Sequence, residues 1–470
     1  MKEKIDMTFN VLVVDPFALA NNPEERNAIF ANIIKQLEQE FPGITASHDS
    51  DSHKLTLSYE GEKFVYALRS DLDKDGIALE LQENPDTYHA IIAAAMNLKG
   101  LAETNPDKWQ EVLQTLQLAV RMGAGTDSII MRDEAGNPIA EKNIKQVSNC
   151  PGINAPAAAH SVIEMLLYGT KHPRIQEMKQ AVLNKETDAN NLSHVYGVAI
   201  DNTSRGDKIG APNNLSEKIA AITGAGNIGS IVIRELCKTC KQVRVSSESL
   251  NNLSDEEKAY LNKTYPNLVI YGRDDTSIFE GADIVSLHTP YRAGQSATLT
   301  QETLSKLNEG ATVVNIGRGG LVDPGAMKEA IRNAKVGHFY SDVDIFFRGQ
   351  DKEPDGPAAA YWELACDDNS KNSITLLPHG VSDAIVDVRQ AMAVKALSIS
   401  VRALAQEAHI NNVYCADAAA VSSSEQPKEV ESLAAEAKKN TSKNMSAVDP
   451  AFKMHKVGGE ALTTTGAIRE

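Results

Sequence analysis

A glycine-rich turn between a predicted strand and a predicted helix constrains the fold of this chain more than any other feature. The strand covers Lys218–Thr223, the turn reads Gly224-Ala-Gly-Asn-Ile-Gly229, and the helix runs from Asn227 to Cys240. Four more apolar runs predict strands, at residues 242–245, 282–287, 311–316 and 373–377. Such alternation of strand and helix specifies right-handed crossovers and a doubly wound parallel sheet.

The three glycines have separate roles in a turn of this kind. Gly224 permits the tight turn, Gly226 lets the backbone approach a pyrophosphate, and Gly229 lets helix and strand pack closely. The first helical amides, at Asn227 and Ile228, are unpaired and would face the anion. A chance glycine triplet in an ordinary loop is the alternative, and the flanking strand and helix make it the weaker one. The turn therefore predicts a dinucleotide cofactor.

The end of the second strand of this domain bears on which dinucleotide binds. An acid about 20 residues after the glycine turn would accept the ribose hydroxyls of NAD, but the expected position holds Ser247. A serine removes repulsion toward the 2′-phosphate of NADP, whereas the adjacent Glu248 and the absence of a following arginine favour NAD. The sequence favours NAD and leaves NADP open.

The length of the chain calls for a second domain. At 470 residues it exceeds the range of about 100 to 200 residues that one domain usually covers. An α/β domain is predicted before residue 150, from strands at 9–15, 54–59, 89–94 and 116–121 and helices at 23–41 and 108–114. Residues 169–216 are polar and predict an extended surface loop. A long apolar-periodic helix is expected over 388–407.

Composition and charge limit the partners. A net charge of −16 leaves no global positive field for nucleic acid or for an anionic membrane surface, so neither is expected as a partner. The N-terminus lacks an apolar signal region, and no stretch approaches the ~18 apolar residues of a membrane span. We therefore expect a cytoplasmic protein. No metal-ligand motif is found, and no metal ion is expected.

The cysteines predict packing rather than disulfides. There are five, Cys150, Cys237, Cys240, Cys366 and Cys415, an odd number that suits reduced thiols. Cys237 and Cys240 form a C-x-x-C that would be redox-active if one thiol were activated. Their place late in the predicted helix favours packing in the core.

Several separated motifs are collinear with those of one family. Residues 120–127 look like its hinge loop, residues 148–154 like its N-x-P-G-x-N segment, and His288-Thr-Pro290, residues 315–323 and Leu377-Pro-His-Gly380 follow in its order. Over residues 110–410 the chain resembles the D-2-hydroxyacid dehydrogenases, which include D-lactate, glyoxylate and phosphoglycerate dehydrogenases. The resemblance implies two doubly wound domains, Rossmann-like and flavodoxin-like, with a cleft between them. It also implies a homodimer that pairs through the nucleotide domains.

The resemblance implies a set of cofactor-binding residues besides the glycine turn and Ser247. These residues are His288, Thr289, Pro290, Ile316, Gly317, Asp342 and Gly380. Asp342 matches the aspartate that contacts the nicotinamide carboxamide.

Three residues match the family's catalytic set. Arg318 lies in a tight turn after a parallel strand, and its planar fork suits the carboxylate of a 2-oxoacid. His379 matches the acid/base that protonates the carbonyl oxygen, as imidazole can near neutral pH. The family's glutamate, which holds that imidazole protonated, lies in a segment that is longer here, so Glu353 is the best counterpart and Asp344 the alternative. A solvated loop arginine and a structural histidine are the competing interpretations.

The resemblance also predicts the substrate contacts. Ala124 and Gly125 would offer backbone amides to the carboxylate, and Asn154 would help to position it; a plain interdomain turn is the alternative. Phosphoglycerate dehydrogenases carry an arginine where this chain reads Ile91-Ile-Ala-Ala-Ala-Met96, which argues against a phosphorylated substrate. His160 stands where the family has a glutamate, and its role is not assigned.

The sequence therefore predicts an NAD(P)-dependent enzyme that interconverts a small D-2-hydroxyacid and its 2-oxoacid. A 3-phosphoglycerate dehydrogenase and a non-catalytic dinucleotide sensor are the alternatives. The expected domains are residues 1–156, the N-terminal part of the substrate domain; 157–380, the Rossmann domain; 381–418, a helix returning to the substrate domain; and 419–470, a flexible tail.

Overall fold

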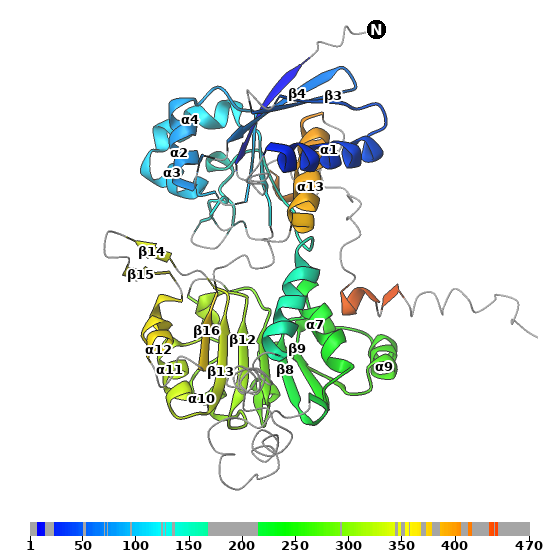
Figure 1. Cartoon of the computed structure of the whole chain (residues 1–470), viewed down its shortest axis with the longest axis vertical. Coiled ribbons are helices and arrows are strands. Elements are labelled where there is room, and N and C mark those ends of the chain that lie inside the picture. The colour runs from blue at the N-terminus through cyan, green and yellow to red at the C-terminus, as the bar shows by residue number, and fades with distance from the viewer. Residues whose placement is uncertain are drawn as a thin grey trace, which may run out of the picture.

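The fold is described from a computed structural model, in which two α/β domains lie one above the other (Figure 1). The residues described are 7–14, 23–49, 53–69, 71–72, 74–94, 96–123, 126, 128–133, 137–167, 215–291, 294–343, 346–348, 353–356, 358–367, 373–377, 386–405, 412–415, 432–436 and 438–439. The prediction of two α/β domains is confirmed.

The N-terminal domain contains a sheet of order β17-β7-β6-β5-β1-β4-β3-β2. Its strands are β1 (Thr8–Val14), β2 (Thr45–Asp49), β3 (Lys54–Tyr59), β4 (Glu62–Arg69), β5 (Ala90–Ala93), β6 (Leu118–Arg121), β7 (Gln146–Asn149) and β17 (Asn412–Cys415). The sheet is mixed rather than wholly parallel, because β2–β3, β3–β4 and β17–β7 pair antiparallel. Between β3 and β4, Glu60 and Gly61 have φ of 52° and 88°, a two-residue hairpin that forces the antiparallel direction.

Helices cover both faces of this sheet because its central strands are apolar on both sides. One face carries α1 (Pro23–Glu40) and α13 (Val386–Leu404), and the other carries α2 (Lys74–Glu83), α3 (Leu98–Thr104) and α4 (Pro106–Thr115) (Figure 1). Val11 and Val13 pack on the first side, and Leu12 and Val14 on the second. The helix α13 therefore belongs to the core of the N-terminal domain although it follows the second domain in sequence.

The second domain contains a parallel sheet of order β10-β9-β8-β11-β12-β13-β16. Its strands are β8 (Ile219–Thr223), β9 (Gln242–Ser246), β10 (Leu268–Tyr271), β11 (Ile284–Leu287), β12 (Ala311–Asn315), β13 (Val336–Ser341) and β16 (Ile374–Leu376). Its helices are α7 (Asn227–Cys237), α8 (Glu248–Asn251), α9 (Asp255–Thr264), α10 (Gln301–Ser305), α11 (Pro324–Arg332) and α12 (Trp362–Cys366). Residues 155–167 form a further helix, which leads into this domain (Figure 1).

The carboxyl end of the second sheet lies toward the N-terminal domain. A hairpin of β14 (Phe346–Arg348) and β15 (Glu353–Asp355) follows β13 and projects at that end of the domain (Figure 1). Loops that follow the strands of an open parallel sheet form its ligand sites.

No helix among those described is long and apolar enough to cross a membrane. Within the region expected as a tail, residues 433–436 are helical and pack on the second domain, with Leu433 fully buried.

The C-x-x-C thiols lie against the core of the second domain. Cys240 is buried and Cys237 half-buried, and both are reduced. Burial raises the pKa of Cys237 to about 12 and that of Cys240 to about 11. Because the thiolate is the reactive form, these values favour packing over redox chemistry.

The buried contact between β4 and α13 yields a prediction for stability. The hydroxyls of Tyr66 and Ser400 lie 3.0 Å apart, both residues are fully buried, and Ser400 Oγ donates to the Leu397 carbonyl. Ser400→Ala leaves the Tyr66 hydroxyl without this partner and is expected to lower the free energy of unfolding by about 1–3 kcal/mol. The double variant Tyr66→Phe/Ser400→Ala removes both hydroxyls and is expected to be more stable than Ser400→Ala. Equal losses in both variants, measured by denaturant unfolding, would contradict the contact.

The thiol environment yields a second prediction. With iodoacetamide at pH 8, the exposed Cys366 is expected to be alkylated first, and Cys237 and Cys240 only after unfolding, because burial keeps them protonated. Mass spectrometry of peptides from the labelled native protein measures each site. Rapid labelling of Cys237 or Cys240 would show an activated thiol instead.

Candidate active site

The candidate site lies where the order of the second sheet reverses. The chain builds β8, β9 and β10 outward on one side and β11, β12 and β13 outward on the other, so β8 and β11 are neighbours. Loops that leave two such strands diverge to opposite faces of the sheet and leave room between them for a ligand. The glycine turn follows β8, and His288 follows β11.

The glycines of the turn fit the roles predicted for them. Gly224 has φ of +87°, and a Cβ there would come within 2.9 Å of the His288 carbonyl oxygen. A Cβ on Gly229 would come within 2.2 Å of the Gly224 carbonyl oxygen. Around Gly226, in contrast, no atom lies within 4 Å of an added Cβ. The turn is therefore closed where helix and strand meet and open where a pyrophosphate would approach.

The start of α7 offers unpaired amides. Gly226 is the residue before the helix and supplies no side-chain cap, so the first amides, at Asn227 and Ile228, have no side-chain acceptor from it. Ser230 donates from Oγ to the Ala225 carbonyl at 2.8 Å and holds the turn from within the helix. An open backbone at the N-terminus of a helix is the environment that a pyrophosphate needs, so these residues fit a dinucleotide.

His288 supports the glycine turn. Its Nε2 lies 2.9 Å from Ser286 Oγ, and its Nδ1 is buried with no hydrogen-bond partner among the described residues. Burial lowers its pKa to about 4, so the ring is neutral near pH 7. Thr289 follows, with its hydroxyl 3.5 Å from that of Thr223, and Pro290 is exposed. The predicted His-Thr-Pro segment thus lies beside the turn.

Arg318 lies in a turn that Asn315 holds on both sides. The Asn315 side chain is buried; it accepts from the Gly317 amide at 3.0 Å and donates to the Arg318 carbonyl at 3.0 Å. The Arg318 guanidinium is exposed, and its Nη1 donates to the Gly317 carbonyl at 2.9 Å. Within the described residues no carboxylate pairs with this guanidinium. Ile316 is half-buried and packs on the core beside it.

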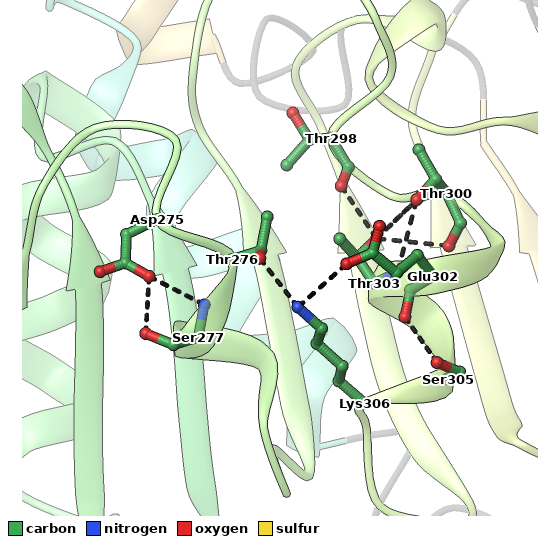
Figure 2. Close-up of polar contacts among 9 residues, drawn as sticks. All are labelled: Asp275, Thr276, Ser277, Thr298, Thr300, Glu302, Thr303, Ser305 and Lys306. Atoms are coloured by element: carbon green, nitrogen blue, oxygen red, sulfur yellow. Dashed lines mark hydrogen bonds and ion pairs between the residues drawn. The ribbon is translucent and has the colours of Figure 1, made fainter.

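Two described residues between β11 and α10, Tyr291 and Thr298, contact the Arg318 turn. The Tyr291 ring lies against Gly320, where an added Cβ would come within 2.3 Å of it. The Thr298 amide donates to the Leu321 carbonyl at 2.9 Å. Thr298 also accepts from the Thr303 hydroxyl, within a group of threonines at the start of α10 (Figure 2). Thr298 is therefore hydrogen-bonded both to the Arg318 turn and to the start of α10.

Arg273 stands beside Glu248, near the predicted adenosine end. Ser247 is buried and caps α8, and its amide donates to the Tyr271 carbonyl at 3.3 Å. Beside it, Glu248 forms an exposed ion pair with Arg273 Nη1 at 3.0 Å. The sequence showed no arginine directly after Ser247, but the turn that follows the neighbouring strand β10 brings Arg273 there.

The structure describes only some of the remaining predicted site residues. Asp342 is buried at the end of β13, and its amide donates to the Asn315 carbonyl at 3.1 Å. Asn154 is half-buried ahead of the helix over 155–167, and His160 is exposed on that helix. Glu353 lies in β15 opposite Arg348, and only its backbone is described. His379, Gly380, Ala124, Gly125 and Asp344 lie outside the described residues.

Three contacts of the candidate site were not predicted from the sequence. Asn315, Tyr291 and Arg273 all act through partners that are distant in sequence or through backbone groups of a turn. Asn315 had a local signal, since an Asn two residues before a Gly-Arg-Gly turn can hydrogen-bond to that turn. The contacts of Tyr291 and Arg273 depend on strand order, which no short motif contains.

Comparison with known proteins identifies the nucleotide domain. Residues 196–366 match the model for the NAD binding domain of D-isomer specific 2-hydroxyacid dehydrogenases. The chain is 25% identical over 233 residues to a D-3-phosphoglycerate dehydrogenase of Bacillus subtilis, which covers 49% of this chain and 37% of that protein. It is 23% identical over 236 residues to a hydroxypyruvate reductase of Thermotoga maritima, covering 50% of this chain and 64% of that protein. The chain thus spans well under half of the first relative's length.

Solved structures share the fold over most of the chain. D-2-hydroxyisocaproate dehydrogenase aligns with a TM-score of 0.55 and 14% identity, over 86% of this chain and 99% of that one. D-lactate dehydrogenase from Aquifex aeolicus, complexed with NAD and lactic acid, aligns with a TM-score of 0.53 and 18% identity, over 86% and 99%. The NAD cofactor predicted from the glycine turn is confirmed by the domain match. Residues 196–366 therefore resemble the NAD binding domain of the D-isomer specific 2-hydroxyacid dehydrogenases, in line with the resemblance found in the sequence.

Proposed function

We propose that this protein is an NAD-dependent oxidoreductase that interconverts a small D-2-hydroxyacid and its 2-oxoacid. One observation carries the proposal: the loops after three adjacent strands are in contact. The turn after β8 meets His288 after β11, and Gly317 after β12 lies near the Leu287 carbonyl oxygen, 3.5 Å from an added Cβ. An anion-binding turn and an exposed arginine therefore share one edge of the sheet.

The residues of this edge suit a 2-oxoacid. The Arg318 guanidinium would bind the substrate carboxylate through two parallel hydrogen bonds and polarise the adjacent carbonyl. Asn315 holds the turn, so little reorganisation is needed when the substrate arrives. When bound, NAD supplies or accepts the hydride. We assign the proton transfer to His379 and the support of its imidazolium to Glu353, both from the family motif.

The substrate is proposed to lack a phosphate group. The strand β5 stands where phosphoglycerate dehydrogenases carry an arginine, and all four of its residues are apolar and buried. Burial at the sheet centre leaves no cation in this strand for a phosphate. A 3-phosphoglycerate dehydrogenase would therefore need a phosphate site elsewhere.

A non-catalytic dinucleotide sensor is the second candidate. It would keep the glycine turn for cofactor binding, and the hairpin β14–β15 favours it because this hairpin lengthens the segment expected to hold the catalytic glutamate. Against it, Arg318 is exposed while its turn is fixed by a buried asparagine, an arrangement that dinucleotide binding alone does not require. A homodimer, a cytoplasmic location, the absence of nucleic-acid partners and the domain boundaries given above remain predictions.

A third prediction concerns turnover. With NADH and a panel of glyoxylate, pyruvate, hydroxypyruvate, bulkier 2-oxoacids and phosphohydroxypyruvate, we expect oxidation of NADH by at least one unphosphorylated compound. His379→Ala is expected to lower kcat by about 100- to 10,000-fold, the usual contribution of a general acid. Arg318→Met is expected to lower kcat/KM by about 100-fold or more, because a charge-stabilising donor is lost. Absorbance of the reduced nicotinamide measures both.

Arg332→Met is the matched control, since Arg332 is exposed on α11 and removal of its charge leaves the turn intact. Binding of NADH without turnover of any compound would favour the sensor. Turnover of phosphohydroxypyruvate alone would favour the phosphoglycerate dehydrogenase.

A fourth prediction concerns the choice between NADH and NADPH. Glu248 pairs with Arg273 and thereby occupies the cation that would otherwise attract a 2′-phosphate. Glu248→Ala is expected to raise kcat/KM for NADPH relative to NADH by about tenfold, or about 1.4 kcal/mol. Ser247→Asp is expected to shift the ratio the other way by like-charge repulsion. Glu256→Ala, on the exposed face of α9, is the control. An unchanged ratio in Glu248→Ala would remove Arg273 from the cofactor site.

A further inference from the structure

A C-terminal segment docks directly on the helix that follows the glycine turn. Residues 433–436 form a single helical turn, and Ser432 precedes it and accepts at Oγ from the Ala435 amide at 3.2 Å. Leu433 is fully buried in the same apolar core as Val232 and Ile233 of α7. We call residues 432–436 the C-terminal clip (Figure 1).

Ser230 joins the clip to the glycine turn. Its hydroxyl donates to the Ala225 carbonyl at 2.8 Å and accepts from the Leu433 amide at 3.1 Å. Ala225 lies between the first two glycines of the turn, and Ser230 is buried. One hydroxyl therefore connects the backbone of the pyrophosphate turn to the backbone of the clip. A hydroxyl that donates and accepts at once is polarised, which strengthens both bonds.

A second contact fixes the far end of the clip. The carboxylate of Glu436 accepts from Arg234 Nη2 at 2.9 Å and from Arg234 Nε at 3.1 Å. Tyr260 and Tyr265 donate to it from their hydroxyls, each at 3.3 Å. Only 14% of the Glu436 side chain and 21% of the Arg234 side chain is exposed. Such a partly buried, multiply bonded pair resists salt and solvent better than a surface pair.

The clip thus contacts α7 at two successive turns. Leu433 binds at Ser230 and Glu436 binds at Arg234, one helical turn further along α7. The pyrophosphate would bind at the start of the same helix, where a shift of the turn moves the amides that receive it. Whatever stabilises this helix start before the cofactor arrives lowers the ordering cost of binding.

We propose that the C-terminal clip is a positioning element of the cofactor site: through Ser230 it holds the glycine turn in the conformation that binds the dinucleotide. The proposal rests on the proposed function for the identity of the ligand. Docking of the clip and binding of the cofactor then favour each other, and linkage requires each to strengthen the other by the same factor. Leu433 and Glu436 act through Ser230 and Arg234 and do not touch the cofactor.

The first arm of the test needs no cofactor. In the full chain, Glu436→Ala is expected to speed tryptic cleavage after Lys438 and Lys439 and to speed amide hydrogen exchange in the peptide that covers residues 224–236. Ser230→Ala is expected to speed exchange there too, because it removes the bridge while leaving the Arg234–Glu436 pair. Glu235→Gln is the matched control, since Glu235 lies on α7 and pairs with the exposed Lys238.

The second arm measures NADH affinity by fluorescence. Glu436→Ala is expected to weaken NADH about fivefold, the lower end of typical coupling between sites, and to raise KM for NADH but not for the oxoacid. Saturating NADH is expected to slow cleavage after Lys438 and Lys439 in the wild type. If the clip had a purely structural role, Glu436→Ala would lower the stability of the protein without changing the KM for NADH or the protection from trypsin that NADH gives.

The outcomes separate this proposal from the proposed function. If cleavage speeds up in Glu436→Ala while exchange in residues 224–236 stays at the wild-type rate, the clip does not position the turn. If cleavage stays slow in Glu436→Ala, the test is repeated with Leu433→Asp, which places a charge in the apolar contact. Faster cleavage in Leu433→Asp with wild-type exchange in residues 224–236 would likewise show that the clip does not position the turn. If the wild type fails to bind NADH, the proposed function is wrong, and the exchange experiment still tests the clip.

Discussion

The whole site depends on the close approach of Gly229 to the Gly224 carbonyl, a distance at which no side chain fits. This approach brings α7 against β8, and the same absence of a side chain at Gly224 lets the His288 backbone pass directly above. Because β8 and β11 flank the reversal of the sheet, the contact joins the two halves of the domain at the point where a ligand would lie. Arg318 comes to the same edge only because β12 is the next strand along.

Groups close to this edge of the sheet, rather than the net charge of the chain, decide how it binds an anion. The chain carries a net charge of −16, so its long-range field disfavours an anionic substrate. At physiological ionic strength that field is screened beyond about 8 Å, which leaves nearby groups to decide binding. The described groups that suit an anion are the amides at the start of α7 and the Arg318 guanidinium. Ser230 fixes the turn that carries the first group, and Asn315 fixes the turn that carries the second. Both side chains are neutral, so neither adds a negative charge that would repel the ligand.

Local sequence patterns predicted the positions of individual strands and helices, because these depend on neighbouring residues. The apolar runs gave β1, β8, β11 and β12 nearly to the residue, and the glycine turn gave the start of α7. Pairing between distant segments was not predictable in this way. The antiparallel edges arise from a two-residue hairpin at Glu60 and from β17, which pairs with β7 from more than 260 residues away. The contacts of Tyr291, Arg273 and Glu436 likewise depend on which loops the sheet brings together, so residue type alone did not single them out.

The position of the clip matters for how a two-domain enzyme would work. The chain passes from β7 to the second domain, returns through α13 and β17, and reaches the second domain again at residue 432. The contacts of Leu433 and Glu436 described above are all with that domain, at Ser230, Arg234, Tyr260 and Tyr265. A positioning element that bridged both domains would have to break whenever the domains move apart to release product. Because the contacts described for the clip lie on α7, on α9 and at Tyr265, all within the second domain, it can keep the glycine turn ordered in either arrangement of the domains.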